Sequence, residues 1–348
     1  MTDDENAVND VIAVTMGDPA GVGPEVLAKV LCSRRARMPG LLLVGSQWAL
    51  EAGIGAAGLT LETPPLVNSA AEMMSLQHPV ALLDVGVPCP ERFEFGVVQA
   101  SCGRHALRAI ETAATLCQRG DVSAMVTCPI NKKAIRTVGE ADDIGHQEIL
   151  ARLSGTRCTA TMLMTPGLRV VHLSTHKSLI EAARYVTRGN VLEKLALMFE
   201  TLEQWGLPAP RIAVAALNPH AGEGGLIGHE EIDELMPAVE DACARGIDAT
   251  GPVPADSVFN RAIAGEFDAV LALYHDQGHI AIKVHDFHAS TTATLGIPFV
   301  RTSVDHGTAF DIAGQGKADA QGLVAAIDAA TAIASGQLAR LHASGQTD

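Results

Sequence analysis

Aromatic residues are scarce in this chain: two Trp, two Tyr and eight Phe make up 3% of its 348 residues. Nearly half of the residues are apolar, so a large core is possible, and we expect Ala, Val, Leu and Ile packed between helices and a sheet. Positive charge is also scarce, with a formal net charge of −15 and no run of basic residues. This balance argues against nucleic acid or an anionic membrane as a partner. It does not exclude a small anionic substrate, because a few cations can dominate a local cleft.

Paired cysteines, a leader segment and a long apolar run are missing as well. The seven Cys residues contain no C-x-x-C pair, and their odd number and scatter favour reduced thiols over a disulfide framework. The opening Met-Thr-Asp-Asp-Glu-Asn has no positive charge and no apolar stretch, so we expect no signal peptide. No uninterrupted apolar segment approaches the length of a membrane span. These absences predict a soluble cytoplasmic protein that does not enter a membrane.

Short apolar runs bounded by Gly, Pro or Asp alternate with longer helical patterns. Such alternation is typical of α/β proteins with a mostly parallel sheet and helices on both faces. The length allows two domains of ordinary size, and the chain then crosses between them more than once, with candidate crossings near 128–146 and 276–310. The expected strands are 11–16, 41–45, 80–85, 124–127, 161–164, 170–174, 212–216 and 269–274, and the expected helices include 24–31, 98–118, 191–206, 229–245 and 323–344.

Three histidines each follow an apolar run and stand in a polar turn. They are His176 in Val-Val-His-Leu-Ser-Thr-His, His220 in Asn-Pro-His-Ala-Gly-Glu-Gly-Gly, and His275 in Leu-Tyr-His-Asp-Gln-Gly. Ligands bind at the carboxyl ends of strands in open α/β sheets, and three imidazoles at one rim suit a divalent metal with an open coordination position. Any one of them alone is better interpreted as a surface or cap histidine. The repetition of one context favours the metal site.

Two glycine-rich motifs have different surroundings. Gly53–Gly58 has the spacing of a dinucleotide-binding motif, but it follows a helical pattern, whereas that motif should follow a strand and open a helix. We interpret it as a helix end and a loop. The segment Thr15–Glu25 does follow a strand, and Pro24 suits the first position of a helix. Its glycines would let a ligand approach the backbone, and the helix N-terminus favours an anion; a tight turn without a ligand is equally compatible.

Four side chains are candidates for binding an acid group. His146 and Gln147 stand at a predicted helix start within 142–150, where two donors beside a helix N-terminus suit phosphate or carboxylate. Lys283 and Arg301 stand among apolar and small residues, at what we interpret as strand ends, and could clamp an anion. Helix capping and solvated surface cations are the competing interpretations.

The segment 305–319 is irregular and contains three glycines, three acids and a histidine. Such a loop could wrap an adenosine through backbone and carboxylate hydrogen bonds, and a plain surface loop is the competing view. The chain has no Gly-x-Ser-x-Gly motif and no Cys with an obvious His partner, so a covalent nucleophile is not expected.

Six motifs occur in order along about residues 11–330: Met-Gly-Asp-Pro-Ala-Gly-Val-Gly-Pro-Glu, Gly-His-x-Glu, Asn-Pro-His-Ala-Gly-Glu-Gly-Gly, Gly-Pro-x-Pro-Ala-Asp, Tyr-His-Asp-Gln-Gly and Arg-Thr-Ser-Val-Asp-His-Gly-Thr-Ala. Together they resemble the PdxA family, the 4-hydroxythreonine-4-phosphate dehydrogenases of vitamin B6 synthesis. The segment that begins at Asp305 is also similar to the NAD-binding loop of isopropylmalate and isocitrate dehydrogenases, whose fold the family shares.

The resemblance implies an α/β fold of the isocitrate/isopropylmalate dehydrogenase type, with two domains, mostly parallel sheets and an interdomain cleft. We expect one domain at 11–129 plus 300–348, carrying the cofactor loop. The other, at 130–299, would carry most of the metal and substrate ligands and the dimer interface. The resemblance further implies a homodimer whose active site is shared across the interface.

The family's functional residues carry over onto matching positions. One divalent ion (Zn, Mg, Co or Mn) would be held by His176, His220 and His275, and NAD or NADP would lie on the loop that contains His306, Gly307, Thr308, Ala309 and Asp311. The substrate would contact His146, Gln147, Lys283, Thr292 and Arg301, with Lys283 and Asp256 as candidates for proton transfer. Three positions depart from the family pattern: Gln147 replaces a Thr, Thr292 replaces an Asn, and His279 replaces the more usual Leu.

The implied chemistry is oxidation of an alcohol beside a carboxylate, with hydride passing to NAD and the resulting 3-oxo acid losing carbon dioxide. The substrate would be a small 3-hydroxy acid, phosphorylated at position 4, such as 4-hydroxythreonine 4-phosphate or threonate or erythronate 4-phosphate. A second possibility is an unphosphorylated cis-dihydrodiol carboxylate such as the terephthalate diol, which would suit the loss of the Thr and Asn contacts. A third, from another class, is a non-catalytic metal- or nucleotide-binding regulator.

Overall fold

The computed structural model describes residues 11–33, 39–139, 145–339 and 341. Their contacts divide the chain into two compact units. Unit 1 holds the described residues up to Arg157 together with Ile297–Ala334, and unit 2 holds Cys158–Gly296 together with the described residues from Ser335 onward. No helix of the described residues is long and apolar enough to cross a membrane.

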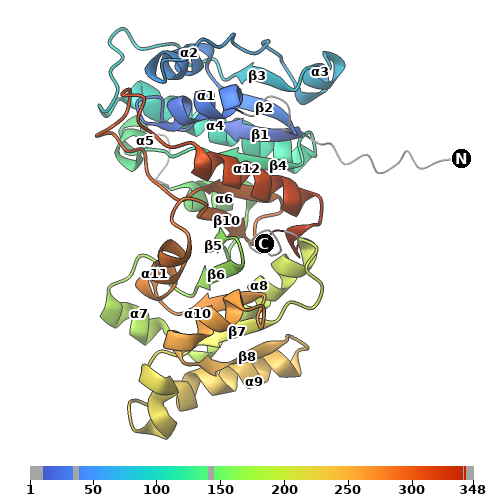
Figure 1. The fold of residues 1–348 in the computed structure, drawn as a ribbon, viewed down its shortest axis with the longest axis vertical. Helices are drawn as coiled ribbons and strands as arrows, with labels where there is room; N and C mark the ends of the chain where they lie inside the picture. The colour runs from blue at the N-terminus through green and yellow to red at the C-terminus, as the bar shows by residue number, and fades with distance from the viewer. Residues whose placement is uncertain (1–10, 34–38, 140–144, 340, 342–348) are drawn as a thin grey trace, which may run out of the picture. The chain divides into compact units, whose positions relative to one another are not determined.

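Unit 1 is built on a parallel sheet with the strand order β3-β2-β1-β4-β11, of which the first four strands are labelled in Figure 1. The strands are β1 (Val11–Thr15), β2 (Gly40–Gly45), β3 (Val80–Asp84), β4 (Ala124–Thr127) and β11 (Val300–Val304). The helices are α1 (Gly23–Ser33), α2 (Gln47–Ala56), α3 (Ala70–Ser75), α4 (Ala100–Arg119), α5 (Lys132–Val138), α6 (His146–Ser154) and α12 (Gln321–Ala334).

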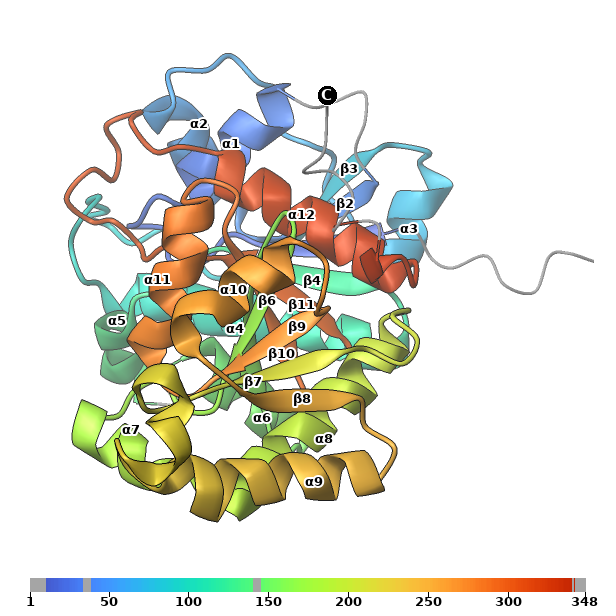
Figure 2. The same ribbon diagram turned by 60° about the horizontal axis from the view of Figure 1, so that its bottom comes forward.

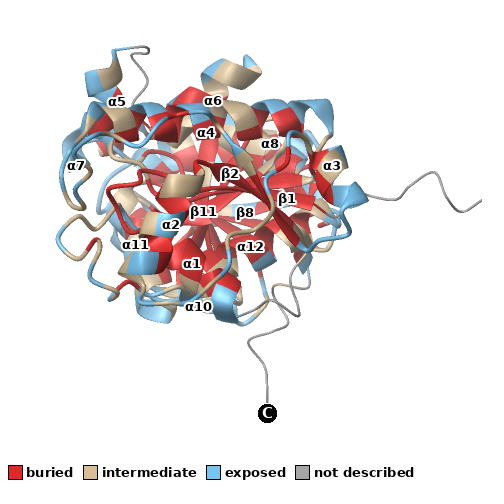
Figure 3. Cartoon of the chain, turned by 90° about the horizontal axis from the view of Figure 1, so that it is seen from above, coloured by how far each residue is buried: buried red, intermediate tan, exposed pale blue. Residues whose placement is uncertain are grey.

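Both faces of this sheet are covered, which explains why its strands are continuous apolar runs (Figure 3). On one face, Val14 and Leu43 pack in a core with α1, α2 and α12, which lie together in Figure 2. On the other face, Ala13 and Leu42 pack with α3, α4, α5 and α6. Alternate residues of a strand therefore serve opposite cores, as the two-residue repeat of a strand requires.

Unit 2 has the strand order β10-β5-β6-β9-β7-β8. The pairs β10–β5 and β5–β6 are antiparallel, and the remaining pairs are parallel. The strands are β5 (Ala160–Thr165), β6 (Leu168–His172), β7 (Ile212–Ala215), β8 (Ala249–Val253), β9 (Ala269–Ala272) and β10 (Thr291–Leu295). The helices are α7 (Leu179–Tyr185), α8 (Arg188–Gln204), the π-helix η2 (Glu231–Leu235), α9 (Met236–Ala244), α10 (Ala255–Ile263) and α11 (His275–His285), and a tight coil, η1, spans Pro219–Gly225.

The expected α/β class with a mostly parallel sheet is confirmed, and the isocitrate dehydrogenase-like arrangement around a cleft remains a prediction. The limits of the two units differ from the expected domain limits of 129/130 and 299/300. Helices α5 and α6 stay with unit 1 because Ile135, Ile149 and Leu150 are buried in the core beneath α4. The segment after α12 belongs to unit 2, where the buried Arg169 donates a hydrogen bond of 2.8 Å to the Leu338 carbonyl.

One of the expected crossings between domains, near 276–310, begins with a helix. Residues 275–285 form α11, although this stretch includes Gly278 and three histidines. The glycine is required by packing, because a Cβ at Gly278 would lie 2.3 Å from Nε2 of His172 on β6. Gly278 therefore leaves space for the ring of His172 and does not mark a turn.

Candidate functional site

Arg301 is the centre of a positively charged cluster in unit 1. It is the second residue of β11, so it lies near the beginning of a strand and not at the end, as the sequence suggested. Its side chain is 5% exposed, and its Nη2 and Nε donate to Oγ1 of Thr127, at the end of β4, over 2.6 and 3.2 Å. Burial lowers the pKa of Arg301 to about 9, so the guanidinium keeps its proton at neutral pH.

His146 belongs to the same cluster. It is the first residue of α6, its Nε2 is buried, and this atom has no hydrogen-bond partner in the structure. Burial holds the pKa of His146 well below 6.5, and the charges of Arg301 and Lys132 lower it further. The imidazole is therefore neutral, and a buried polar nitrogen without a partner is costly unless a ligand satisfies it.

The cluster has the properties of an anion site. Arg301 supplies a fixed positive charge, Lys132 a second one from the exposed start of α5, and α6 directs its N-terminus at the same place. Gln147, half-buried at the second position of α6, lies at this end as expected from the sequence. The preceding residues 140–144, which include the Asp142 of the sequence motif, lie outside the described part of the chain.

The other two expected substrate residues lie in unit 2. Thr292 is 9% exposed on β10, directly opposite Leu163 of β5. Lys283 lies in the last turn of α11 with its Nζ 4.9 Å from the centre of the Phe287 ring. The sequence interpretation of Lys283 as a strand-end residue is therefore wrong, because the chain after His275 is helical.

The three expected metal ligands also lie in unit 2, in three different settings. His176 is exposed in the loop after β6, four residues beyond the strand end. His220 lies in η1, where five consecutive residues from His220 to Gly224 have positive φ. His275 is the first residue of α11, and its side chain is 44% exposed. Within the described ranges, no three His, Cys, Asp or Glu side chains are arranged to hold an ion.

Two of these histidines are nevertheless oriented as metal ligands usually are. Nδ1 of His220 lies 2.6 Å from Oε1 of Glu223, and Nδ1 of His275 lies 2.7 Å from Oδ1 of Asp276. In metal sites a carboxylate commonly holds one ring nitrogen and leaves the other for the ion. The hydrogen bond to Glu223 raises the pKa of His220, and the charges of Glu223 and then Asp256 add to this. The donor set therefore fits a divalent ion in its chemistry.

Two further histidines lie beside His275: His172, which the sequence analysis missed, and His279, which it noted only as a departure from the family pattern. His172, the last residue of β6, is 3% exposed, and its Nε2 lies 3.1 Å from Nδ1 of His279. Burial lowers the pKa of His172 to about 3, with the charges of His279 and His275 contributing. The ring of His279 stacks on that of His275, with centroids 3.6 Å apart and planes at 13°. The four-residue spacing of His275 and His279 would have revealed this stack if the helix had been recognised.

The expected cofactor loop lies in unit 1. The Thr308 carbonyl accepts a hydrogen bond of 3.0 Å from the Val22 amide, and Ala309 has a φ of 42°. Asp311 is exposed, and its carbonyl is bonded by the side chain of Gln315. His306 is exposed as well, with its Nδ1 2.9 Å from the carbonyl of the neighbouring Gly307. The loop therefore presents the Asp311 carboxylate to solvent, as a carboxylate that binds an adenosine would need, whereas the carbonyls of Gly307, Thr308 and Asp311 already have partners.

The glycine motif that we set aside is part of a helix and its end, as expected. Gly53 and Gly55 lie inside α2, which ends at Ala56, and Gly58 follows with a φ of 64°. A Cβ at Gly53 would lie 2.4 Å from the backbone of Pro24, so this glycine serves helix packing.

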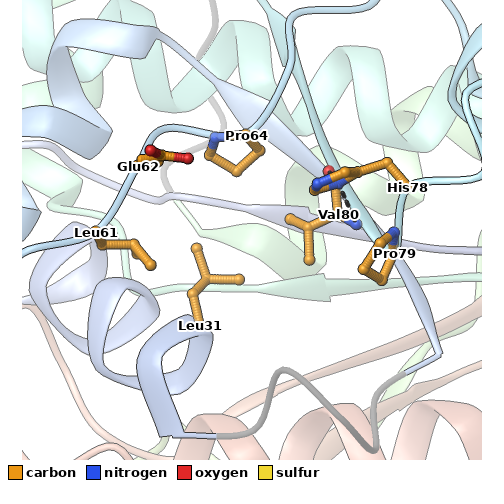
Figure 4. A pocket seen from close by; sticks show the side chains of 7 residues that line it. All are labelled: Leu31, Leu61, Glu62, Pro64, His78, Pro79 and Val80. Carbon is orange, nitrogen blue, oxygen red and sulfur yellow. Dashed lines mark hydrogen bonds between the residues drawn. The ribbon is translucent and has the colours of Figure 1, made fainter.

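Two cavities lie at opposite ends of their sheets. One of about 330 Å³ in unit 1 is lined by residues that include Leu31, Glu62 and His78, and it opens beside Val80, the first residue of β3 (Figure 4). This amino end of a parallel strand is not where α/β folds bind substrates. The other, of about 690 Å³ in unit 2, is lined by α10 and α11 and includes Asp256.

Comparison with known proteins supports the resemblance. The sequence profile described as pyridoxal phosphate biosynthetic protein PdxA matches residues 38–330. A D-threonate 4-phosphate dehydrogenase of Cupriavidus necator is 43% identical over 91% of this chain and 95% of its own. The crystal structure of a 4-hydroxythreonine-4-phosphate dehydrogenase from Klebsiella pneumoniae is 38% identical, with a TM-score of 0.85 over 93% of this chain and 99% of its own.

A more distant solved structure is a terephthalate 1,2-cis-dihydrodiol dehydrogenase from Burkholderia xenovorans. It is 29% identical, with a TM-score of 0.64 over 92% of this chain and 97% of its own. The profile match spans most of the sequence, and the identity to the Cupriavidus protein extends over nearly all of both chains. This chain belongs to the PdxA family of dehydrogenases.

Proposed function

We propose that this protein is a dehydrogenase of a small 3-hydroxy acid 4-phosphate, and that it depends on a nicotinamide dinucleotide and a divalent metal. The observation that carries the proposal is the cluster of Arg301, Thr127 and His146. A buried guanidinium, a neutral imidazole with an unsatisfied buried Nε2 and a helix N-terminus together suit a phosphate, which accepts several short hydrogen bonds.

Threonate 4-phosphate is the substrate that we favour. The relative from Cupriavidus necator bears this substrate in its name and is more similar to this chain than the hydroxythreonine 4-phosphate and dihydrodiol dehydrogenases described above. Threonate differs from 4-hydroxythreonine in having a hydroxyl group in place of an ammonium group next to the carboxylate. Gln147 lies beside His146 at the proposed phosphate site, which both substrates would fill, so Thr292, the other departure from the pattern of the biosynthetic enzymes, is the candidate for this discrimination.

The reaction follows from the substrate class. The loop that contains Thr308 and Asp311 would hold the dinucleotide, which would supply a hydride acceptor for the carbon that bears the 3-hydroxyl group, and the hydroxyl oxygen would lose its proton. The products are a ketone, NADH and a proton. A 3-oxo acid then loses carbon dioxide, and the carbon left behind takes up a proton, so that a phosphorylated ketone remains.

Residues of this chain have distinct roles in that sequence. Arg301 and His146 bind the phosphate and orient the substrate. Asp256, at the start of α10 and close enough to His220 to affect its pKa, is our candidate for accepting the hydroxyl proton. Lys283 on α11 is the candidate for returning a proton after decarboxylation. A divalent ion on His176, His220 and His275 would supply Lewis-acid stabilisation of the negative charge that develops on oxygen.

The metal requirement is tested by His220→Ala. This variant should lose its divalent ion, measured by elemental analysis after dialysis, and should form no NADH. His78→Ala is the matched control, since His78 is exposed beside the small cavity of unit 1. A chelator-stripped His220→Ala protein with full activity would refute the metal proposal.

The substrate is tested by comparing threonate 4-phosphate, 4-hydroxythreonine 4-phosphate and a dihydrodiol dicarboxylate in NADH formation. Each lost charge-assisted hydrogen bond costs about 1.5–3 kcal/mol, or about one to two powers of ten in kcat/KM. We expect threonate 4-phosphate to be the best of the three by at least that factor. A preference for the unphosphorylated diol would overturn the phosphate assignment. A protein that turns over none of the three would favour a regulator.

We also propose that the protein is a homodimer and that the cavity between α10 and α11 lies at the interface. Ile280 is 61% exposed and Val284 81% exposed on α11, and Ile263 on α10 is exposed beside them. Apolar side chains gathered on one face usually mark an interaction surface.

A further inference from the structure

The glycine-rich turn between β1 and α1 lies against the cofactor loop. The Val22 amide donates to the Thr308 carbonyl over 3.0 Å, and a Cβ at Gly21 would lie 2.9 Å from Cβ of Thr308. The turn therefore needs a glycine at position 21, because a side chain there would collide with Thr308 of the cofactor loop. The sequence alone left open whether this turn binds a ligand, and the geometry gives it a different task.

A second contact, formed by Glu25 and Lys29 of α1, lies at the far end of the same loop. Nζ of Lys29 donates to the carbonyls of Gly316 and Ala318 over 2.9 and 2.6 Å and to Oε1 of Glu25 over 2.9 Å. The carboxylate of Glu25 accepts from the amides of Ala318 and Gly316 over 2.9 and 3.3 Å. All three protons of the ammonium group are used, and Gly316 and Ala318 are each held at their backbone N–H and C=O.

This ion pair is unusual because Glu25 is fully buried, while the side chain of Lys29 is 23% exposed. Burying a charge costs free energy that an apolar pair would not cost, so such pairs are weak evidence for stability alone. The pair instead fixes the position of residues 316–318, because four backbone groups of this segment are bonded to the single helix α1.

The position matters because the loop between the two contacts has no regular structure. Ala309 and Gly314 have positive φ, and Asp311, the expected adenosine ligand, is exposed between them. The contact at Thr308 fixes the beginning of this segment, and the pair on α1 fixes its end. Asp311 then has a defined place before any nucleotide binds.

We propose that Glu25 and Lys29 are positioning residues for the cofactor loop, which they hold in the shape that binds the dinucleotide. The inference rests on the proposed function, since it takes the loop to be the nucleotide site. The energetic consequence is preorganisation. Residues 309–315 lose their conformational entropy when the protein folds, so this cost does not reduce the free energy of dinucleotide binding.

The test is Lys29→Met, which keeps the length of the side chain and removes its hydrogen bonds to the loop. Loss of a bond to a charged group should raise KM for NAD about tenfold, with kcat and KM for the hydroxy acid phosphate within about twofold of the unaltered enzyme. Amide exchange of residues 309–318 in the nucleotide-free protein should become faster. Lys317→Met is the matched control, because this substitution removes one positive charge from the loop itself but breaks only a bond within the loop, to Gln315, and none to α1.

Four outcomes decide the matter. Selective loss of NAD affinity with faster exchange supports the proposal, and Lys29→Arg should restore part of both. A lower melting temperature with unchanged KM for NAD and unchanged exchange would show a merely structural ion pair and overturn it. Should Lys29→Met fail to fold, Glu25→Gln tests the same contact, because the amide still accepts from the loop but carries no charge. If the unaltered protein forms no NADH, the proposed function fails, while the exchange of the loop still reports whether the pair holds it.

Discussion

Asp18, in the glycine-rich turn, should make the stability of this protein fall as the pH rises. Its side chain is fully buried; Oδ1 accepts a bond of 2.9 Å from the Ala20 amide, and Oδ2 has no partner. Burial raises the pKa of Asp18 from 3.8 to about 6, opposed by the bond from Ala20. The folded state therefore binds a proton more tightly than the unfolded state, so the stabilisation is complete below about pH 3.8 and is lost as the pH rises through 6.

The size of this effect follows from the two pKa values. They differ by about two, and each pH unit corresponds to about 1.4 kcal/mol, so the ionised Asp18 carboxylate costs about 3 kcal/mol at pH 8. Asp18→Asn keeps an oxygen for the Ala20 amide and carries no charge. We expect the variant to be more stable than the unaltered protein by up to that amount at pH 8, and by much less at pH 4.5.

The assay is thermal unfolding of both proteins between pH 4.5 and pH 8. The gain in Tm should reach about 5 °C at the alkaline end and should shrink as the pH falls through 6. Glu91→Gln, at an exposed position in unit 1, removes the same charge and should show no such dependence. A gain that is constant with pH, or an Asn variant that is less stable at pH 8, would refute the reasoning.

Three further predictions concern the proposed site. Val284→Asp should convert a dimer into monomers, checked by light scattering, and a dimeric variant would contradict the proposed interface. Asp311→Ala should raise KM for NAD about tenfold through the loss of a hydrogen bond to a charged group, whereas Gly55→Ala, which has open space around it, should leave KM unchanged; the reverse would show that the other glycine motif binds the cofactor. His146→Asn should raise KM for the phosphorylated substrate. The pH profile of the unaltered enzyme should show no inflection from His146 between about pH 6 and 8, because the pKa of this residue lies well below 6.5. An inflection in that range that vanishes in the Asn variant would contradict the neutral imidazole.

Eight of the strands coincide with apolar runs that the sequence predicted, because buried strands of such a sheet are continuous apolar runs, whereas β8, β10 and β11 were not among the predicted strands. The sequence analysis failed for α11, where Gly278 makes room for the ring of His172. Gly103 in α4 makes room for the Ala134 carbonyl in the same way, since a Cβ would approach that carbonyl to 2.3 Å, but there the helix at 98–118 was predicted. A sequence shows a glycine only as a weak helix former, since the partner that needs the space is distant in the chain.

The candidate site was predicted in part for a similar reason. His220 and His275 were named as candidate ligands because a polar turn after an apolar run marks a strand end, and that role stays a prediction. Arg301 was found for its setting among small residues, although its place at the beginning of β11 was not. His172 was overlooked because its burial depends on α11, which packs against the end of β6. The residues next to His172 in the sequence do not show that contact.

The coil that carries His220 has a consequence for engineering. Three residues with side chains, His220, Ala221 and Glu223, occupy left-handed backbone conformations that cost about 1–2 kcal/mol each. A selection for heat resistance that ignores activity should therefore collect changes such as Ala221→Gly in this short segment. Libraries meant to preserve catalysis are better directed elsewhere, because relaxing the coil would also free the imidazole whose orientation it sets.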